Sequence, residues 1–208
     1  MARVNAVLFD ADGVLQLAPD FLHLRLAEAI GRAADERETC MAEVFAAEAP
    51  ALTGAATFEA GLQVALAKLE AKCDVDTVIR HWCEIEPDGA ILAMIGRLRA
   101  KGVYCAIASN QERNRARHMS ERLGYGRAFH QEFYSCDVGH AKPSPSYFEA
   151  VIRTAALAPH RTLFIDDRLE NVEAARGCGL LAEQFVLWRS GATELKQILR
   201  KHGLAADS

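Results

Sequence analysis

The sequence predicts an α/β protein built on a parallel sheet, with a separate group of helices inserted after the first strand. Two observations lead to this fold class. Over residues 88–190, short apolar runs alternate with helical patterns, which is the order of strand–helix–strand units with helices on both faces of a sheet. Between the first apolar run and the second, by contrast, the chain shows helical periodicity and no strand candidate.

The first strand is expected over residues 4–9, an apolar and β-branched run that ends at polar residues. Helix signals follow later in the chain: Gly102 is placed to end one helix, and Pro145 suits the first turn of another. The other strands are expected at 103–108, 162–165 and 184–187, with a weaker one at 132–135, and the helices at 88–101, 111–123, 145–152, 171–176 and 194–202.

The inserted segment is expected to form four helices, because its leucines and other apolar residues recur at helical spacing. Its charge also differs from that of the rest: residues 16–87 hold 13 acids and 6 bases, a net −7, whereas the remainder has 15 acids and 18 bases, a net +3. We therefore predict a core formed by residues 1–15 and 88–208 and a helical cap formed by residues 16–87. The alternative is that these helices simply pack on the sheet.

Composition excludes several classes of protein. Half of the 208 residues are hydrophobic and a quarter are charged, as in globular proteins, and no apolar run is long enough to span a bilayer. The net charge of −4 argues against nucleic-acid and membrane partners, and the N-terminal apolar stretch is too short for a signal peptide, so a cytoplasmic protein is expected. Six scattered cysteines without a C-x-x-C pair suggest neither a zinc site nor a disulfide framework, and most are expected to be buried.

Carboxylates follow two of the predicted strands. Asp10 and Asp12 come after the first strand, and Asp166 and Asp167 follow the strand at 162–165. In an open parallel sheet the carboxyl ends of the strands border the ligand crevice, so these four side chains are expected to meet there. They would repel one another unless a cation lay among them, and oxygen ligands of this kind favour magnesium (Mg²⁺).

Two further polar pairs follow predicted strands. Ser109 and Asn110 come just before a predicted helix, where a hydroxyl and free backbone N–H groups can bind a phosphate. Lys142, followed by Pro143, also precedes a helix and could neutralise a phosphate while keeping a nearby carboxylate ionised. Each pair alone is an ordinary turn or cap, so the prediction depends on their joint occurrence in this order.

That joint pattern resembles the haloacid dehalogenase superfamily, whose members are mainly phosphatases. Asp10-x-Asp12-Gly13-Val14 resembles its first motif, Ser109-Asn110 its second, Lys142-Pro143 its third and Asp166-Asp167 its fourth. The run over residues 166–175 is typical of members with a helical cap between the first two motifs. Within that group the chain is most similar to the sugar-phosphate phosphatases and the phosphatase domains of soluble epoxide hydrolases.

The resemblance implies a Rossmann-like core of five strands, in which the strand before Asp10 and the strand before Asp166 are neighbours. It implies that Asp10 is the nucleophile and forms an aspartyl-phosphate, and that Asp12 is the general acid and base. Magnesium would be held by the Asp10 carboxylate, the Asp12 backbone carbonyl, the Asp167 carboxylate and Asp166, directly or through water. The phosphoryl group of a small phosphomonoester would be held by Ser109, the Asn110 backbone and Lys142.

The sequence leaves alternatives open. Ala11 is similar to the true dehalogenases, but these have tyrosine where this chain has Asp12. A phosphomutase of the β-phosphoglucomutase type would use the same residues, and a binding protein on the same scaffold would need no catalysis. The sequence does not decide between a monomer and a homodimer.

Some conspicuous residues are not expected to be functional. Arg113, Arg115 and Arg117, with His118, are interpreted as a solvated helix surface. Trp82 and Phe58 are expected in the hydrophobic core of the cap. The glycine pairs at 124–126 and 177–179 are interpreted as helix ends. In the cap, His23 and Arg25 are candidates for facing the site, with an exposed surface position as the alternative.

Overall fold

A five-stranded parallel sheet forms the centre of the molecule. The computed structural model describes residues 3–204, so that residues 1–2 and 205–208 of the predicted core lie outside the described part. The strand order is β5-β4-β1-β6-β7, which confirms the predicted sheet. It also confirms that the strand before Asp10 and the strand before Asp166 are neighbours. The strands are β1 (Ala6–Phe9), β4 (Tyr104–Ser109), β5 (Gln131–Tyr134), β6 (Thr162–Asp166) and β7 (Leu181–Gln184).

The register of the central strand decides which residues meet at the carboxyl edge. Phe9, the last residue of β1, lies opposite Ile107 of β4 and Ile165 of β6. Because all three strands run in the same direction, the residues that follow them leave the sheet at the same edge. The polar residues after β1, β4 and β6 are therefore gathered there by backbone pairing alone.

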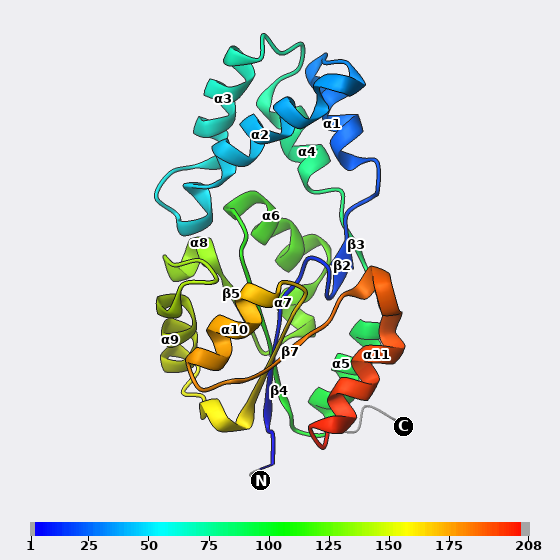
Figure 1. Ribbon diagram of the computed structural model, residues 1–208, viewed down its shortest axis with the longest axis vertical. Helices are drawn as coiled ribbons and strands as arrows, with labels where there is room; N and C mark the ends of the chain where they lie inside the picture. The colour runs from blue at the N-terminus through cyan, green and yellow to red at the C-terminus, as the bar shows by residue number, and fades with distance from the viewer. Residues whose placement is uncertain (1–2, 205–208) are drawn as a thin grey trace.

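Helices cover both faces of the sheet (Figure 1). Side chains alternate along β1, so that Val7 and Phe9 join one hydrophobic cluster and Leu8 joins another on the opposite face. The first cluster includes residues of α5 (Gly89–Ala100) and α11 (Leu187–Lys201), and the second includes residues of α9 (Pro145–Thr154) and α10 (Leu169–Gly177).

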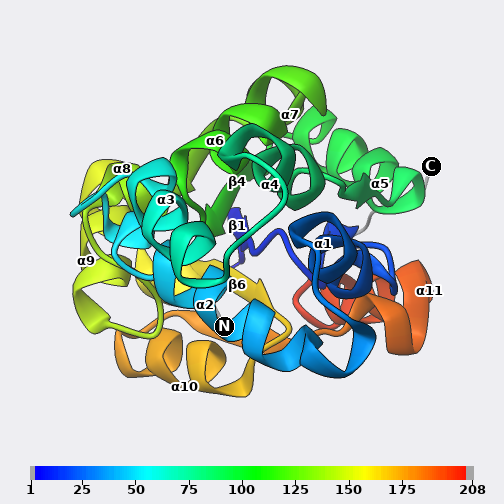
Figure 2. The ribbon, with the colours of Figure 1, turned by 90° about the horizontal axis from the view of Figure 1, so that it is seen from above.

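Four helices stand over the carboxyl edge of the sheet, as Figures 1 and 2 show. They confirm the four helices predicted in the insertion. They bury their own hydrophobic cluster, which shares no residue with the two clusters on the sheet. The helices are α1 (Leu22–Ile30), α2 (Arg37–Glu48), α3 (Phe58–Lys68) and α4 (Val75–Trp82), with 3₁₀ turns η1 (Ala34–Glu36) and η2 (Ala51–Thr53).

The expectation that the insertion contains no strand is wrong at its two ends. Gln16–Leu17 (β2) and Glu86–Pro87 (β3) pair as a short antiparallel ribbon, extended by a hydrogen bond from the Asp88 N–H to the Leu15 carbonyl at 2.8 Å. Two residues are too few to show an alternating pattern, so the pairing arises from the meeting of the two chain ends and not from local sequence.

Two predicted elements near the C-terminus are displaced. The strand expected at 184–187 lies at Leu181–Gln184, because Leu187 turns into the hydrophobic cluster beneath α11 and begins that helix. The helix expected from residue 194 therefore begins earlier, with a kink at Gly191, where φ is 60°. Elsewhere the structure adds the short helices α7 (Tyr125–Ala128) and α8 (Ser135–Val138) and the 3₁₀ turn η4 (Pro159–Arg161).

All six cysteines are free thiols, and Cys40, Cys105 and Cys136 are buried. Among residues 3–204, no helix is both long enough and apolar enough to cross a bilayer.

Candidate active site

Three carboxylates meet at the carboxyl edge of the sheet. Asp10 follows β1, Asp166 ends β6 and Asp167 comes next, and each offers an oxygen within 4.8 Å of the other two. The chain after Asp10 turns back tightly at Gly13, where φ is 77° and an added Cβ would lie 2.7 Å from Asp167 Oδ2. A side chain at this position would displace the Asp167 carboxylate.

Lys142 joins two of these carboxylates. Its Nζ donates to Asp10 Oδ1 at 2.7 Å and to Asp166 Oδ2 at 2.6 Å, and its side chain is 1% exposed. The backbone of Lys142 is fixed by Asn110: the Asn110 amide donates to the Lys142 carbonyl, and the Lys142 N–H donates to Asn110 Oδ1, both at 2.8 Å. The Asn110 side chain therefore holds the lysine in place.

The charges in this cluster do not balance. Burial raises the pKa of Asp10 to about 7, and the neighbouring carboxylates of Asp166 and Asp12 act in the same direction, against the attraction of Lys142. Burial together with Asp166 raises the pKa of Asp167 to about 6. One lysine thus faces three carboxylates, and an all-oxygen donor set with excess negative charge fits a hard divalent cation such as magnesium.

Both carboxylate oxygens of Asp166 already accept hydrogen bonds. Oδ1 accepts from the Arg168 N–H at 2.8 Å and from the Asn171 amide at 3.0 Å, while Oδ2 accepts from Lys142. Of the three carboxylates, those of Asp10 and Asp167 are therefore better placed to bind a cation directly.

Asp12 lies beside this cluster in a different environment. Its Oδ1 accepts from Arg115 Nη2 at 2.7 Å and from Gln16 Nε2 at 2.9 Å, and its Oδ2 accepts from Gln111 Nε2 at 2.7 Å. Burial acts to raise the pKa of Asp12, but the Arg115 charge and the three hydrogen bonds outweigh it, so that the pKa lies below its usual value.

The interpretation of Arg115 as a solvated residue is wrong. Its side chain is 8% exposed, whereas Arg113 is 70% exposed as expected. These arginines lie on α6 (Arg113–Arg117), which continues as a π-helical turn, η3 (His118–Arg122), through most of the helix predicted at 111–123. Arg113 and Arg117 are four residues apart and share a face, so Arg115 points to the opposite side. This helical phase is the sequence signal that could have identified it.

The predicted phosphate-binding helix end also needs correction. Ser109 is buried at the end of β4, and its Oγ accepts from Gln111 Nε2 at 3.3 Å. The helix begins at Arg113, however, and its first N–H groups donate to the Glu112 carboxylate, from Asn114 at 2.7 Å and from Arg115 at 2.8 Å. Because this internal carboxylate caps the helix, the Asn114 and Arg115 N–H groups are not free for a phosphate.

A cavity of about 310 Å³ lies between the inserted helices and the core. His23 lines it, whereas Arg25 pairs with Glu84 at 2.8 Å and is half-exposed. Trp82 and Phe58 belong to the buried cluster of the insertion, as predicted, although the Trp82 ring also borders this cavity. The cavity is lined by Asp12, Gly13, Leu17, Ala18, Leu22, His23, Phe45, Glu48, Trp82, Asn110, Gln111 and Arg115.

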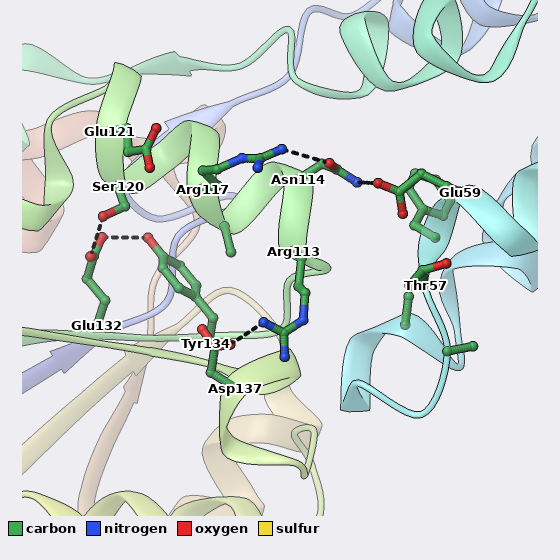
Figure 3. Close-up of a pocket in the computed structure, with 14 residues that line it drawn as sticks. Thr57, Glu59, Arg113, Asn114, Arg117, Ser120, Glu121, Glu132, Tyr134 and Asp137 are labelled. Carbon is green, nitrogen blue, oxygen red and sulfur yellow. Dashed lines mark hydrogen bonds and ion pairs between the residues drawn. The ribbon is translucent and has the colours of Figure 1, made fainter.

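A larger cavity, of about 470 Å³, includes none of the predicted site residues. Its polar side chains pair with one another, as Figure 3 shows: Asn114 donates to Glu59 at 2.9 Å, and Ser120 and Tyr134 both donate to Glu132. The bond between Asn114 and Glu59 ties α6 to α3. This cavity lies at the seam between insertion and core, and among the described residues its carboxylates form no group of three that could share a metal ion.

The chain is similar to a family of known proteins. A model of the haloacid dehalogenase-like hydrolases matches residues 4–179. The N-acetylmuramic acid 6-phosphate phosphatase of Pseudomonas aeruginosa is 26% identical over 185 residues, which is 85% of this chain and 79% of that protein. The phosphoglycolate phosphatase of Escherichia coli K12 is 26% identical over 105 residues, 48% of this chain and 42% of that protein.

Solved structures share the fold. A HAD family enzyme from Bacteroides thetaiotaomicron, in complex with magnesium and inorganic phosphate, superposes with a TM-score of 0.73 at 19% identity and covers 87% of this chain and 93% of that one. A HAD phosphatase from Thermococcus onnurineus gives a TM-score of 0.68 at 19% identity, with 94% and 98% covered.

Proposed function

We propose that this chain, which belongs to the haloacid dehalogenase-like hydrolases, is a magnesium-dependent phosphatase that hydrolyses a small phosphomonoester. The observation that carries the proposal is the cluster at the carboxyl edge of the sheet, where Lys142 bridges Asp10 and Asp166, and an oxygen of Asp167 lies within 4.8 Å of an oxygen of each. A nucleophile, a cation site and a fixed lysine are there within one small volume. The phosphatases among the relatives support the same reaction class.

Magnesium would be held by the carboxylates of Asp10 and Asp167 and by the Asp12 carbonyl. Asp166 would act through water, because its oxygens already accept from Lys142, Asn171 and the Arg168 N–H. When bound, the cation would offset the excess carboxylate charge and the charge of the phosphoryl oxygens.

The protein groups would perform a two-step transfer. An Asp10 oxygen attacks phosphorus and the bond from phosphorus to the ester oxygen breaks. Asp12 passes to that oxygen the proton it took from water in the hydrolysis step of the preceding turnover, which yields an aspartyl-phosphate and the free alcohol. Asp12 then takes a proton from water, which attacks the same phosphorus and releases phosphate. Ser109, the Asn110 N–H and Lys142 would hold the phosphoryl oxygens throughout.

We further propose that residues 16–87 act as a cap over residues 1–15 and 88–208. The separate hydrophobic cluster of α1–α4 and the 310 Å³ cavity beneath these helices support this division. A covered site excludes bulk water from the aspartyl-phosphate and limits the substrate to a small molecule, such as a sugar phosphate.

The test is phosphate release from a panel that contains hexose phosphates, phosphoglycolate and p-nitrophenyl phosphate. Release should stop with excess EDTA and return when magnesium is added. Rapid hydrolysis without a bisphosphate activator would exclude the mutase alternative. If pure protein released no phosphate from any ester in the presence of magnesium, the proposal would fail.

A further inference from the structure

Arg115 connects Asp12 to the inserted helices. Its Nη2 donates to Asp12, and its guanidinium lies 5.6 Å from the centre of the Trp82 ring, at the end of α4. The Trp82 indole N–H in turn donates to Glu48 Oε1 of α2 at 3.1 Å. Viewed from above, α4 lies next to α6 over the sheet (Figure 2). A continuous set of contacts thus runs from two inserted helices to the predicted acid and base.

The other two donors to Asp12 are held by residues of the core. Gln16 is buried and accepts from the Tyr125 hydroxyl at 3.0 Å. The N–H of Gln111 donates to Ser135 Oγ at 3.0 Å. Neither contact involves an inserted helix, so these two amides would keep their places if the insertion shifted.

Arg115 is held differently. Its backbone is fixed by the Glu112 cap, but its buried Nε has no hydrogen-bond partner among the described residues. Among the described residues, the guanidinium donates to the Asp12 carboxylate and lies over the Trp82 ring, and the Glu48 carboxylate of α2 attracts it as well. A cation over an aromatic ring is attracted to it, more strongly where water is excluded. Loss of the ring would leave the arginine, and with it Asp12, less well ordered.

We propose that Arg115 is a positioning residue that makes the orientation of Asp12 depend on the inserted helices, through Trp82. The inference rests on the proposed phosphatase function. With Trp82 against the guanidinium, Arg115 holds the Asp12 carboxylate beside the 310 Å³ cavity, where the leaving group would lie. When α4 moves away, this restraint is lost. Proton transfer to the leaving group then becomes efficient only with the insertion in place.

The first experiment compares leaving groups in single-turnover reactions, with p-nitrophenyl phosphate and the alkyl phosphate that the panel shows to react fastest. Arg115→Met should slow the alkyl ester by about 10²-fold, because a small displacement of a reacting group has this effect, whereas nitrophenolate leaves without a proton and its release should change little. Arg115→Lys keeps the charge and should recover part of the loss. Arg113→Met, on the exposed face of the same helix, is the matched control.

The second experiment tests the route through Trp82. Trp82→Leu should show the same selective loss for the alkyl ester, and should add little to Arg115→Met in the double variant. Equal slowing of both esters by Arg115→Met, or additive losses in the double variant, would overturn the proposal. If Arg115→Met does not fold, Arg115→Lys and Trp82→Leu provide the same comparison.

A spectroscopic readout separates this inference from the phosphatase function itself. The chain has two tryptophans, and Trp188 is 68% exposed, so Trp188→Phe leaves Trp82 as the only indole emitter. In that background Arg115→Met should shift Trp82 emission, and Arg113→Met should not. An unchanged spectrum would contradict the contact even in active protein. Conversely, if Arg115→Met shifts the Trp82 emission but the protein hydrolyses no ester, the contact between Arg115 and Trp82 is supported and the proposed phosphatase function is contradicted.

Discussion

The candidate site has two halves that are built differently. Asp10, Lys142 and Asp166 lie on strand ends and loops of the core, and each pairs with another core residue. On the other side, Asp12 depends on Arg115, which in turn lies against Trp82 of the insertion. The first half is fixed by sheet register, and the second half by packing between two separate hydrophobic clusters. We expect the core half to determine whether the proposed nucleophile reacts, and the insertion half to determine which leaving group receives a proton.

The largest effect is expected from Asp10→Asn in the core half. The amide is almost the same size but is a poor nucleophile, so kcat should fall by several orders of magnitude while the fold is kept. Steady-state kinetics and circular dichroism measure the two quantities. Asp137→Asn, at a 58% exposed side chain, is the control. Substantial turnover by pure Asp10→Asn protein would remove Asp10 from the role of nucleophile.

Lys142→Met tests the same half through stability. It leaves two buried carboxylates without their shared partner, which should lower the free energy of unfolding by about 3–5 kcal/mol. Urea unfolding in EDTA measures the loss. Lys68→Met, at a 65% exposed side chain paired with Glu43, should lose less than about 1 kcal/mol. Similar losses at the two positions would show that Lys142 does not stabilise the cluster.

Asp12→Asn tests the insertion half of the site. The alkyl ester should react at least about 10²-fold more slowly, because its alkoxide needs a proton. The p-nitrophenyl ester should be much less affected in the phosphorylation step. Single-turnover rates give the comparison directly, and equal slowing of both esters would contradict the acid assignment.

The remaining prediction concerns Glu48, which accepts a hydrogen bond from Trp82 of the insertion half. Burial raises its pKa from 4.5 to about 7, although the Trp82 hydrogen bond opposes the shift. The folded state therefore keeps a proton that the unfolded chain releases, and the free energy of unfolding should fall as pH rises from 4.5 to 7. Glu48→Gln should remove up to about 3 kcal/mol of this dependence. Urea unfolding at pH 5 and pH 8 measures it, with Glu36→Gln at an exposed side chain as the control. The same pH slope in both variants would contradict the raised pKa.

The same division separates what the sequence could predict from what it could not. Asp10, Ser109 and Asp166 could be placed because each follows or ends a strand, and strand ends are visible as apolar runs that stop at polar residues. For Arg115 the helical phase indicates only that it lies on the side opposite Arg113 and Arg117. Glu48 could not be placed at all, since a charged residue on a helix has the same local pattern whether it faces solvent or a neighbouring domain. Only its packing partners, far away in sequence, distinguish the two cases.

The same limit applies to the prediction of helices and strands. β1, β4 and β6 contain enough apolar residues to be recognised as strands from the sequence. The four inserted helices show a clear helical periodicity of apolar residues. The strand predicted at 184–187 lies three residues earlier, as β7, because Leu187 is as apolar as a strand residue but packs beneath a helix. The ribbon of β2 and β3 is formed by two-residue segments, which contain no period to detect.

That ribbon bears on how the chain folds. Ala6 of β1 pairs with Tyr104 and with Thr162, so the sheet cannot grow from local contacts, and contacts distant in sequence form slowly. The β2–β3 pairing closes residues 18–85 into a loop whose two ends stay together. Once the ribbon has formed, β4 and β1 are separated only by the short segments between each strand and the ribbon. The conformational search that pairs these two strands then no longer involves the whole insertion. Since the entropy of closing a loop rises only with the logarithm of its length, insertions of quite different size could occupy this position with little change in the folding of the sheet.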